Sequence, residues 1–225
     1  MEVLEGLEPH PNIERIMIKN YLGEKFPPWL LMMKIPSDGD SSRVFDNLVE
    51  LRLRNCKWCE QLPMLGHLRR LKELWIAGMN KIRSIGNEFY GISDGSMSNG
   101  VRPFPALKVL GFSSMKSLLE WKAAPVDEGA ETVVFSYLEE FIITKCPLLT
   151  KIPLRIQDCE ELSYLFDELH SFPSTAMRRL SKLMQLRIGG CPFLRENCAK
   201  GSGSEWSKIS HLPCILIRET RLRRV

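Results

Sequence analysis

The sequence lacks the features that mark membrane proteins and disulfide-rich secreted proteins. No apolar run approaches the roughly 20 residues that a membrane-spanning helix needs. The first five residues are acidic and too short in apolar residues for a signal peptide. The seven cysteines are an odd number, which argues against a closed disulfide framework, and reduced thiols fit an intracellular compartment. We therefore expect a cytoplasmic protein without a membrane partner.

The sequence also lacks a legible motif for catalysis, for a metal or for a cofactor. The phosphate-binding pattern G-x-x-x-x-G-K-[ST] does not occur. Cys56 and Cys59 have zinc-ligand spacing, but no second C-x-x-C follows, so we expect one core and one loop cysteine. The acidic stretch 38–40 lacks the spaced acids of a calcium loop and predicts a turn. The sequence predicts neither an enzyme nor a bound cofactor.

Charge gives little reason to expect a nucleic-acid partner. The formal net charge is +4 over 225 residues, which is too small to argue for nucleic acid by itself. The basic end of the chain, residues 218–225, carries four arginines and is expected to be a solvated tail. With 44% hydrophobic and 26% charged residues, the composition is that of an ordinary folded domain.

What the sequence does contain is a repeat of the form L-x-x-L-x-L-x-x-C. Leu48, Leu51 and Leu53 cannot all lie on one face of a helix, but all can point inward from a short strand that follows a turn. The pattern recurs in six clear units: Ile13 to Tyr21, Leu48 to Cys56, Leu71 to Met79, Leu107 to Met115, Leu138 to Cys146 and Leu183 to Cys191. A half-match, Leu154 to Cys159, is expected to be a seventh unit that lacks the first leucine.

These units predict an α/β fold, a leucine-rich-repeat solenoid forming a single domain over residues 1–225 with about seven irregular repeats. We expect a parallel β-sheet on the concave face, and irregular loops with short 3-10 or helical turns on the convex face. Three stretches rich in Gly, Ser, Asp or Pro account for the uneven repeat spacing and predict solvent-facing insertions, at 37–42, 91–100 and 124–131. Residues 160–175 fit either one helical face or a degenerate repeat. Residues 215–217 predict a last short strand.

The cysteines fit the same repeat. Four of them fall at one repeat position, where a buried cysteine acts as a small apolar residue with a weak S–H donor. These four are Cys56, Cys146, Cys159 and Cys191. We therefore expect them to belong to the core.

Several longer stretches resemble a known family. They are residues 62–74, 82–91 and 104–107, together with 9–13, 26–30, 191–198 and 206–213. In combination and order they resemble the C-terminal leucine-rich-repeat region of plant nucleotide-binding leucine-rich-repeat disease-resistance proteins of the coiled-coil type. The resemblance implies a role in innate immunity, namely sensing pathogen effectors and helping to hold the switch domain inactive. Because the phosphate loop is missing, no nucleotide binding is carried over to any residue. The chain also begins in mid-repeat, and we expect either the C-terminal part of a longer protein or a truncated gene.

The residues that alternate outward from the strands form the candidate functional surface. We expect a protein-binding face built from Arg15, Lys19, Glu50, Arg52, Arg54, Glu73, Trp75, Glu140 and Arg187. This face is basic around Arg52 and Arg54, aromatic at Trp75, and bare and apolar near Gly111 and Ile142. Outward tryptophan and arginine are common binding hot spots, so Trp75 is the leading candidate.

The expected partner is a pathogen effector or a guarded host protein, and the chain's own nucleotide-binding domain if the receptor is full length. An alternative reading is a substrate adaptor of a ubiquitin ligase. That alternative requires a ligase-docking motif, and none is visible in the sequence.

Overall fold

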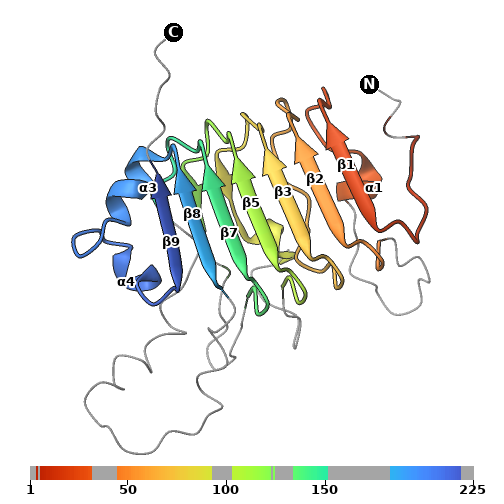
Figure 1. The fold of residues 1–225 in the computed structure, drawn as a ribbon. Coiled ribbons are helices and arrows are strands. Elements are labelled where there is room, and N and C mark those ends of the chain that lie inside the picture. The colour runs from red at the N-terminus through yellow and green to blue at the C-terminus, as the bar shows by residue number, and fades with distance from the viewer. Residues whose placement is uncertain are drawn as a thin grey trace, which may run out of the picture.

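The computed structural model describes residues 4, 6–31, 45–92, 103–122, 124, 134–151 and 183–218. Within them the chain winds through seven parallel strands that form one sheet (Figure 1). The strands are β1 (Arg15–Lys19), β2 (Glu50–Arg54), β3 (Glu73–Ala77), β5 (Val109–Ser113), β7 (Glu140–Thr144), β8 (Gln185–Gly189) and β9 (Cys214–Arg218). Their order in the sheet follows the chain, so each turn of the solenoid adds one strand beside the last. The predicted α/β leucine-rich-repeat solenoid is confirmed.

Each strand of the main sheet is five residues long, and every one except β9 buries its second and fourth positions. The burial pattern alternates along β1 and β2, and the parallel register stacks like positions on each other, so that Leu51 lies beside Leu74 and Leu53 beside Ile76. Side chains point alternately to opposite faces of a strand, so one set of apolar residues enters the core and the other set faces outward. The six predicted units all have their strands where the repeat pattern places them, and β9 confirms the expected last strand.

A residue in the left-handed backbone conformation follows each of the first six strands of the main sheet. Its backbone N–H continues the hydrogen bonding between neighbouring repeats beyond the strand ends. These residues are Asn20, Asn55, Gly78, Ser114, Lys145 and Gly190, with φ between 55° and 69°. The backbone N–H of Asn20 donates to the Arg54 carbonyl at 2.9 Å, and the N–H of Asn55 donates to the Ala77 carbonyl at 2.7 Å. Glycine and asparagine tolerate this conformation best, and together they fill four of the six positions. The turn thereby links neighbouring repeats as the strands do.

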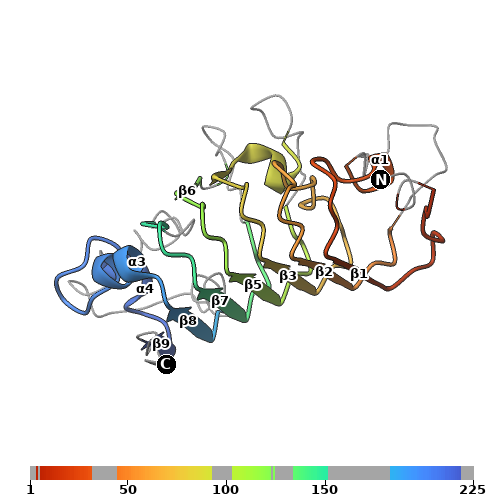
Figure 2. The ribbon, with the colours of Figure 1, turned by 90° about the horizontal axis from the view of Figure 1, so that it is seen from above.

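The other side of the solenoid consists of short turns, as predicted. It carries α1 (Pro28–Leu31), the 3-10 helix η1 (Asn87–Tyr90), α3 (Pro192–Asn197) and α4 (Trp206–Ile209). It also carries a small parallel sheet in which β4 (Ser84–Ile85) pairs with β6 (Glu120–Trp121). Figure 2 shows these elements on one side of the main sheet, which leaves the opposite face of the sheet uncovered by them.

A cluster of aromatic side chains fills the middle of the solenoid between the two sheets. The ring of Trp121 lies 4.5 Å from that of Phe112 and 5.5 Å from that of Phe141, measured between centroids. The indole N–H of Trp121 donates to the Tyr90 hydroxyl at 3.0 Å, and that hydroxyl donates to the Lys122 carbonyl at 2.9 Å. The polar atoms of both rings are thus satisfied inside an apolar core, as buried tyrosine and tryptophan require. Nothing in the repeat pattern predicted this cluster.

The repeat-position cysteines that the structure describes are buried, as predicted. Cys56, Cys146 and Cys191 have almost no exposed surface, and the Cys146 backbone N–H donates to the Cys191 sulfur at 3.3 Å. A hydrogen bond from the Cys146 thiol lowers the pKa of Cys191, and the same contact raises the pKa of Cys146. Of the expected pair of one core and one loop cysteine, Cys59 does lie in a loop, but it belongs to the core as well. Cys59 is fully buried because its thiol reaches the Gly23 carbonyl of the preceding repeat at 3.3 Å.

Several sequence-based predictions fall outside the described residues. They concern the insertion at 37–42, most of those at 91–100 and 124–131, the half-match with Cys159, residues 160–175 and the end of the basic tail. Among the helices that the structure describes, none is long and apolar enough to cross a membrane. The same residues contain no group of three or more metal-ligating side chains.

His67 makes the stability of the fold depend on pH. Burial lowers the pKa of this side chain to about 4, an effect that Asp46 partly opposes, and in the described part of the chain its buried Nδ1 atom has no hydrogen-bond partner. In the unfolded chain the imidazole has its ordinary pKa of about 6.5, so the unfolded state gains a proton first as the pH falls. We expect the free energy of unfolding to drop by about 2 kcal/mol between pH 7 and pH 5 from this group alone.

Urea denaturation of the chain and of two variants across this range checks the expectation. His67→Gln should remove this part of the pH dependence, whereas His10→Gln, at an exposed position, should leave it in place. An unchanged pH profile in His67→Gln would assign the effect to other groups.

Candidate protein-binding face

The uncovered face of the main sheet, here called the open face, consists of the first, third and fifth positions of each strand. In sheet order the first positions are Arg15, Glu50, Glu73, Val109, Glu140, Gln185 and Cys214. The third positions are Met17, Arg52, Trp75, Gly111, Ile142, Arg187 and Leu216, and the fifth are Lys19, Arg54, Ala77, Ser113, Thr144, Gly189 and Arg218. The in-register pairing turns these residues into three straight columns. The acids lie in the first column, while the fifth-position column has cations and no acid.

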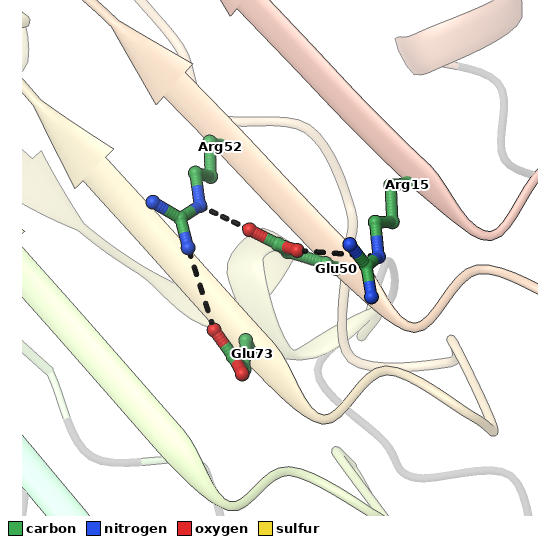
Figure 3. A network of polar contacts seen from close by, with 4 residues as sticks. All are labelled: Arg15, Glu50, Arg52 and Glu73. Carbon is green, nitrogen blue, oxygen red and sulfur yellow. Dashed lines mark hydrogen bonds and ion pairs between the residues drawn. The ribbon is translucent and has the colours of Figure 1, made fainter.

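Four charged side chains at one end of the open face form a connected network (Figure 3). Glu50 lies between two arginines: its carboxylate accepts a hydrogen bond from Arg52, and it lies 3.6 Å from Arg15. Arg52 reaches in the other direction to Glu73, also at 3.6 Å. Only 18% of the Glu50 side chain is exposed, against 77% for Arg15, so Glu50 is the sheltered centre of the network. The strands β1, β2 and β3 are therefore linked on this face by side chains as well as by their backbones.

Trp75 continues this network with an aromatic side chain. The guanidinium carbon of Arg52 lies 6.0 Å from the centroid of the Trp75 ring, within range of a cation–π interaction. On its other side the ring lies over Gly111, where a Cβ atom would overlap the ring edge. The Trp75 ring can pack directly on the Gly111 backbone because glycine has no Cβ atom at that position. The Trp75 indole nitrogen is buried and has no hydrogen-bond partner among the described residues, so within them the ring is held by packing and by Arg52.

Beyond Gly111 the open face becomes apolar and then polar again. Ile142 follows in the same column and is half-buried. The Thr144 hydroxyl donates to the Ser113 hydroxyl at 3.0 Å in the fifth-position column. The Arg187 guanidinium donates to the Gln185 side chain at 2.7 Å. This half of the face has fewer charges than the half around Glu50.

The nine residues predicted for the site all lie on the open face. The structure brings Arg15, Glu50, Arg52 and Glu73 into the network, with Trp75 beside it. Lys19 and Arg54 lie side by side at the strand ends, while Glu140 and Arg187 lie further along the sheet. Whether these residues bind a partner stays a prediction.

Sequence reasoning missed what Gly111 does. It described the neighbourhood of Gly111 as bare, although the Trp75 ring fills that space. The signal was present, since the repeat alignment already set the glycine directly beside the tryptophan. It also missed the ion pair in which Lys108 contacts Glu139 at 2.7 Å, just before β5 and β7.

Comparison with known proteins points to one family. Residues 1–79 match the model of the R13L1/DRL21 leucine-rich repeats. The chain is 34% identical over 189 residues to the putative disease resistance RPP13-like protein 1 of Arabidopsis thaliana, a match that covers 80% of this chain. It is 29% identical over 201 residues to the disease resistance protein RGA2 of Solanum bulbocastanum, over 87% of this chain. No solved structure matches.

The matched region is a small part of each relative. It spans 17% of the length of the RPP13-like protein and 19% of RGA2. Over most of its own length, however, the chain aligns with these proteins, and the predicted resemblance is confirmed. The repeat register, the parallel solenoid and these similarities together identify the chain as a leucine-rich-repeat region of the plant disease-resistance protein family.

Proposed function

We propose that this chain is the protein-recognition module of an intracellular plant immune receptor and acts by binding rather than by catalysis. In the resting state its open face contacts the receptor's nucleotide-binding switch domain and helps to keep that domain inactive. In the activated state it contacts a pathogen effector or a guarded host protein. Such a switch requires that the contacts differ in free energy between the two states.

The observation that carries the proposal is the arrangement around Trp75. A tryptophan on an uncovered sheet face is held by a glycine on one side and by an arginine on the other. Large, rigid side chains lose little conformational entropy on binding, and tryptophan and arginine dominate the energetics of protein interfaces. The network around Glu50 fixes the arginine in place. This part of the open face is therefore organised before any partner arrives.

Trp75→Ala should weaken binding of the chain to the protein that co-purifies with it from plant cells by more than about 1 kcal/mol. The main effect should fall on binding, because the ring lies on the outer face of the sheet rather than in the core. Biolayer interferometry gives the affinity, and a thermal melt of the same preparation gives the stability.

Phe193→Ala is the matched control for this change. Phe193 is also an aromatic residue and is 50% exposed, but it lies on α3, on the other side of the sheet. Its replacement should leave the affinity unchanged. If Trp75→Ala mainly unfolds the chain, or if both variants bind as the original chain does, the open face is not the binding surface.

A further inference from the structure

The cations of the open face differ in whether an acid lies beside them. Arg15 and Arg52 both contact Glu50, and Arg52 also contacts Glu73. By contrast, Lys19 and Arg54 are exposed and form no ion pair with any acid in the described part of the chain. The same holds for Lys57, which follows β2 at the rim of the sheet. Charge left unpaired on the surface is available to a partner of opposite sign.

The fold brings these three cations to one corner of the solenoid. Lys19 and Arg54 are direct neighbours at the ends of β1 and β2. The turns that follow stay aligned, because the Asn55 side-chain amide donates to the Asn20 side chain at 3.2 Å. Lys57 follows Asn55 by two residues and therefore lies at the rim next to the two strand ends. Two acids lie on the same turns: Glu60 is 4.0 Å from Lys81, and the Glu24 backbone carbonyl accepts a hydrogen bond from the Glu60 N–H at 3.1 Å.

Three large apolar side chains are exposed on β1 and on the adjacent turns that follow β1 and β2, where the Cys59 thiol contacts the Gly23 carbonyl and the Trp58 ring lies 5.9 Å from the Lys81 ammonium. Met17 precedes Lys19 on the same face of β1 and is 58% exposed, while Leu22 and Trp58 at the rim are 71% and 51% exposed. We call this set the basic corner: Met17, Lys19, Leu22, Arg54, Lys57 and Trp58. Exposed apolar side chains gathered in one patch mark surfaces that become covered by a partner.

We infer that the basic corner binds an acidic segment of a protein partner. Carboxylates of that segment meet Lys19 and Arg54, and its apolar side chains cover Met17 and Trp58. The inference rests on the proposed function, since it names the chemistry of a partner of the same module. A nucleic acid fits less well, because the first-position acids Glu50 and Glu73 would face a phosphate backbone laid across the strands. Charge complementarity here gives specificity and a fast association rate, while the apolar contacts supply affinity.

The test uses a short fluorescent peptide of glutamates with two leucines, and fluorescence anisotropy as the readout. The double variant Lys19→Glu with Arg54→Glu should raise the Kd for this peptide about tenfold or more. The control double variant, Lys151→Glu with Lys200→Glu, makes the same change in net charge at exposed lysines elsewhere and should leave the Kd unchanged. Added salt should weaken binding to the original chain.

Several results would overturn the inference: no binding of the acidic peptide, equal weakening by both double variants, or equal binding of the same peptide with lysine in place of glutamate. Binding of single-stranded DNA or of phosphatidylserine vesicles as tightly as the peptide would assign the corner to another class of partner and also overturn it. The proposed function is tested separately. If Trp75→Ala weakens binding of the plant partner to the chain while the acidic peptide fails to bind, only the inference about the basic corner is wrong.

Discussion

Replacing Trp121 by alanine is expected to lower the free energy of unfolding by about 3–5 kcal/mol. Trp121 is 3% exposed, and its ring contacts aromatic rings from the strand side and from the outer side of the solenoid. Its removal leaves a large cavity and also takes away the donor to the Tyr90 hydroxyl. Urea denaturation followed by circular dichroism measures the loss.

The conservative variant Trp121→Phe separates packing from hydrogen bonding. It keeps most of the ring but loses the indole N–H, so we expect a smaller loss, of about 1–2 kcal/mol. An alanine variant that is no less stable than the phenylalanine variant would mean that the aromatic cluster does not hold the two sheets together.

Gly66→Ala is expected to cost about 2–4 kcal/mol of stability. A Cβ atom at Gly66 would overlap the backbone of Tyr90 at the end of η1. Backbone atoms cannot rotate away as a side chain can, so η1 must move. That movement strains the hydrogen bond from the Gly66 N–H to the Phe89 carbonyl, which is 3.1 Å long, and the bond from the Phe104 N–H to the Gly66 carbonyl, which is 2.6 Å long.

Gly111→Ala is the matched comparison, since the chemical change is the same. At Gly111 the new methyl group overlaps the Trp75 side chain, which can rotate away from the backbone at this position. We expect a smaller loss of stability than at Gly66, together with a change in tryptophan fluorescence. Equal losses at the two glycines would contradict the distinction between a backbone contact and a side-chain contact.

The strands could be predicted from the sequence because their physical cause is local and periodic. Leu51 and Leu53 alternate with polar residues and have equivalents in the neighbouring repeats, so inward and outward positions follow directly. The parallel register then follows because equivalent residues of neighbouring repeats stack on each other. The columns of the open face, including Trp75 beside Gly111, are a consequence of that register.

Other features could not be predicted because their cause is not periodic. Phe89, Tyr90 and Trp121 lie in segments outside the repeat pattern, and only the packing of neighbouring coils brings them together. The burial of the loop residue Cys59 could not be predicted for the same reason, since its hydrogen-bond partner belongs to the preceding repeat. The ion-pair network depends on side-chain conformations. The strand register places Arg52 near Glu50 and Glu73, but only the conformation of its side chain brings it into contact with both.

Alternate residues of the same strands have separate roles under the proposed function. Inward positions such as Leu51 carry the stability of the solenoid, and we propose that outward positions such as Arg52 and Trp75 carry recognition. Because nearest-neighbour repeats hold each other in place, outward residues can change with little effect on the fold.

The most direct test of this central claim is site-specific photocrosslinking of the chain in plant cells. A photoreactive phenylalanine at Ile142, on the open face, should crosslink to a protein, and the crosslink should disappear when Trp75→Ala is added. The same group at Phe193, on the other side, should give no such product. Crosslinking at Phe193 but not at Ile142, or a product at Ile142 that is insensitive to Trp75, would contradict the assignment of the open face as the recognition surface.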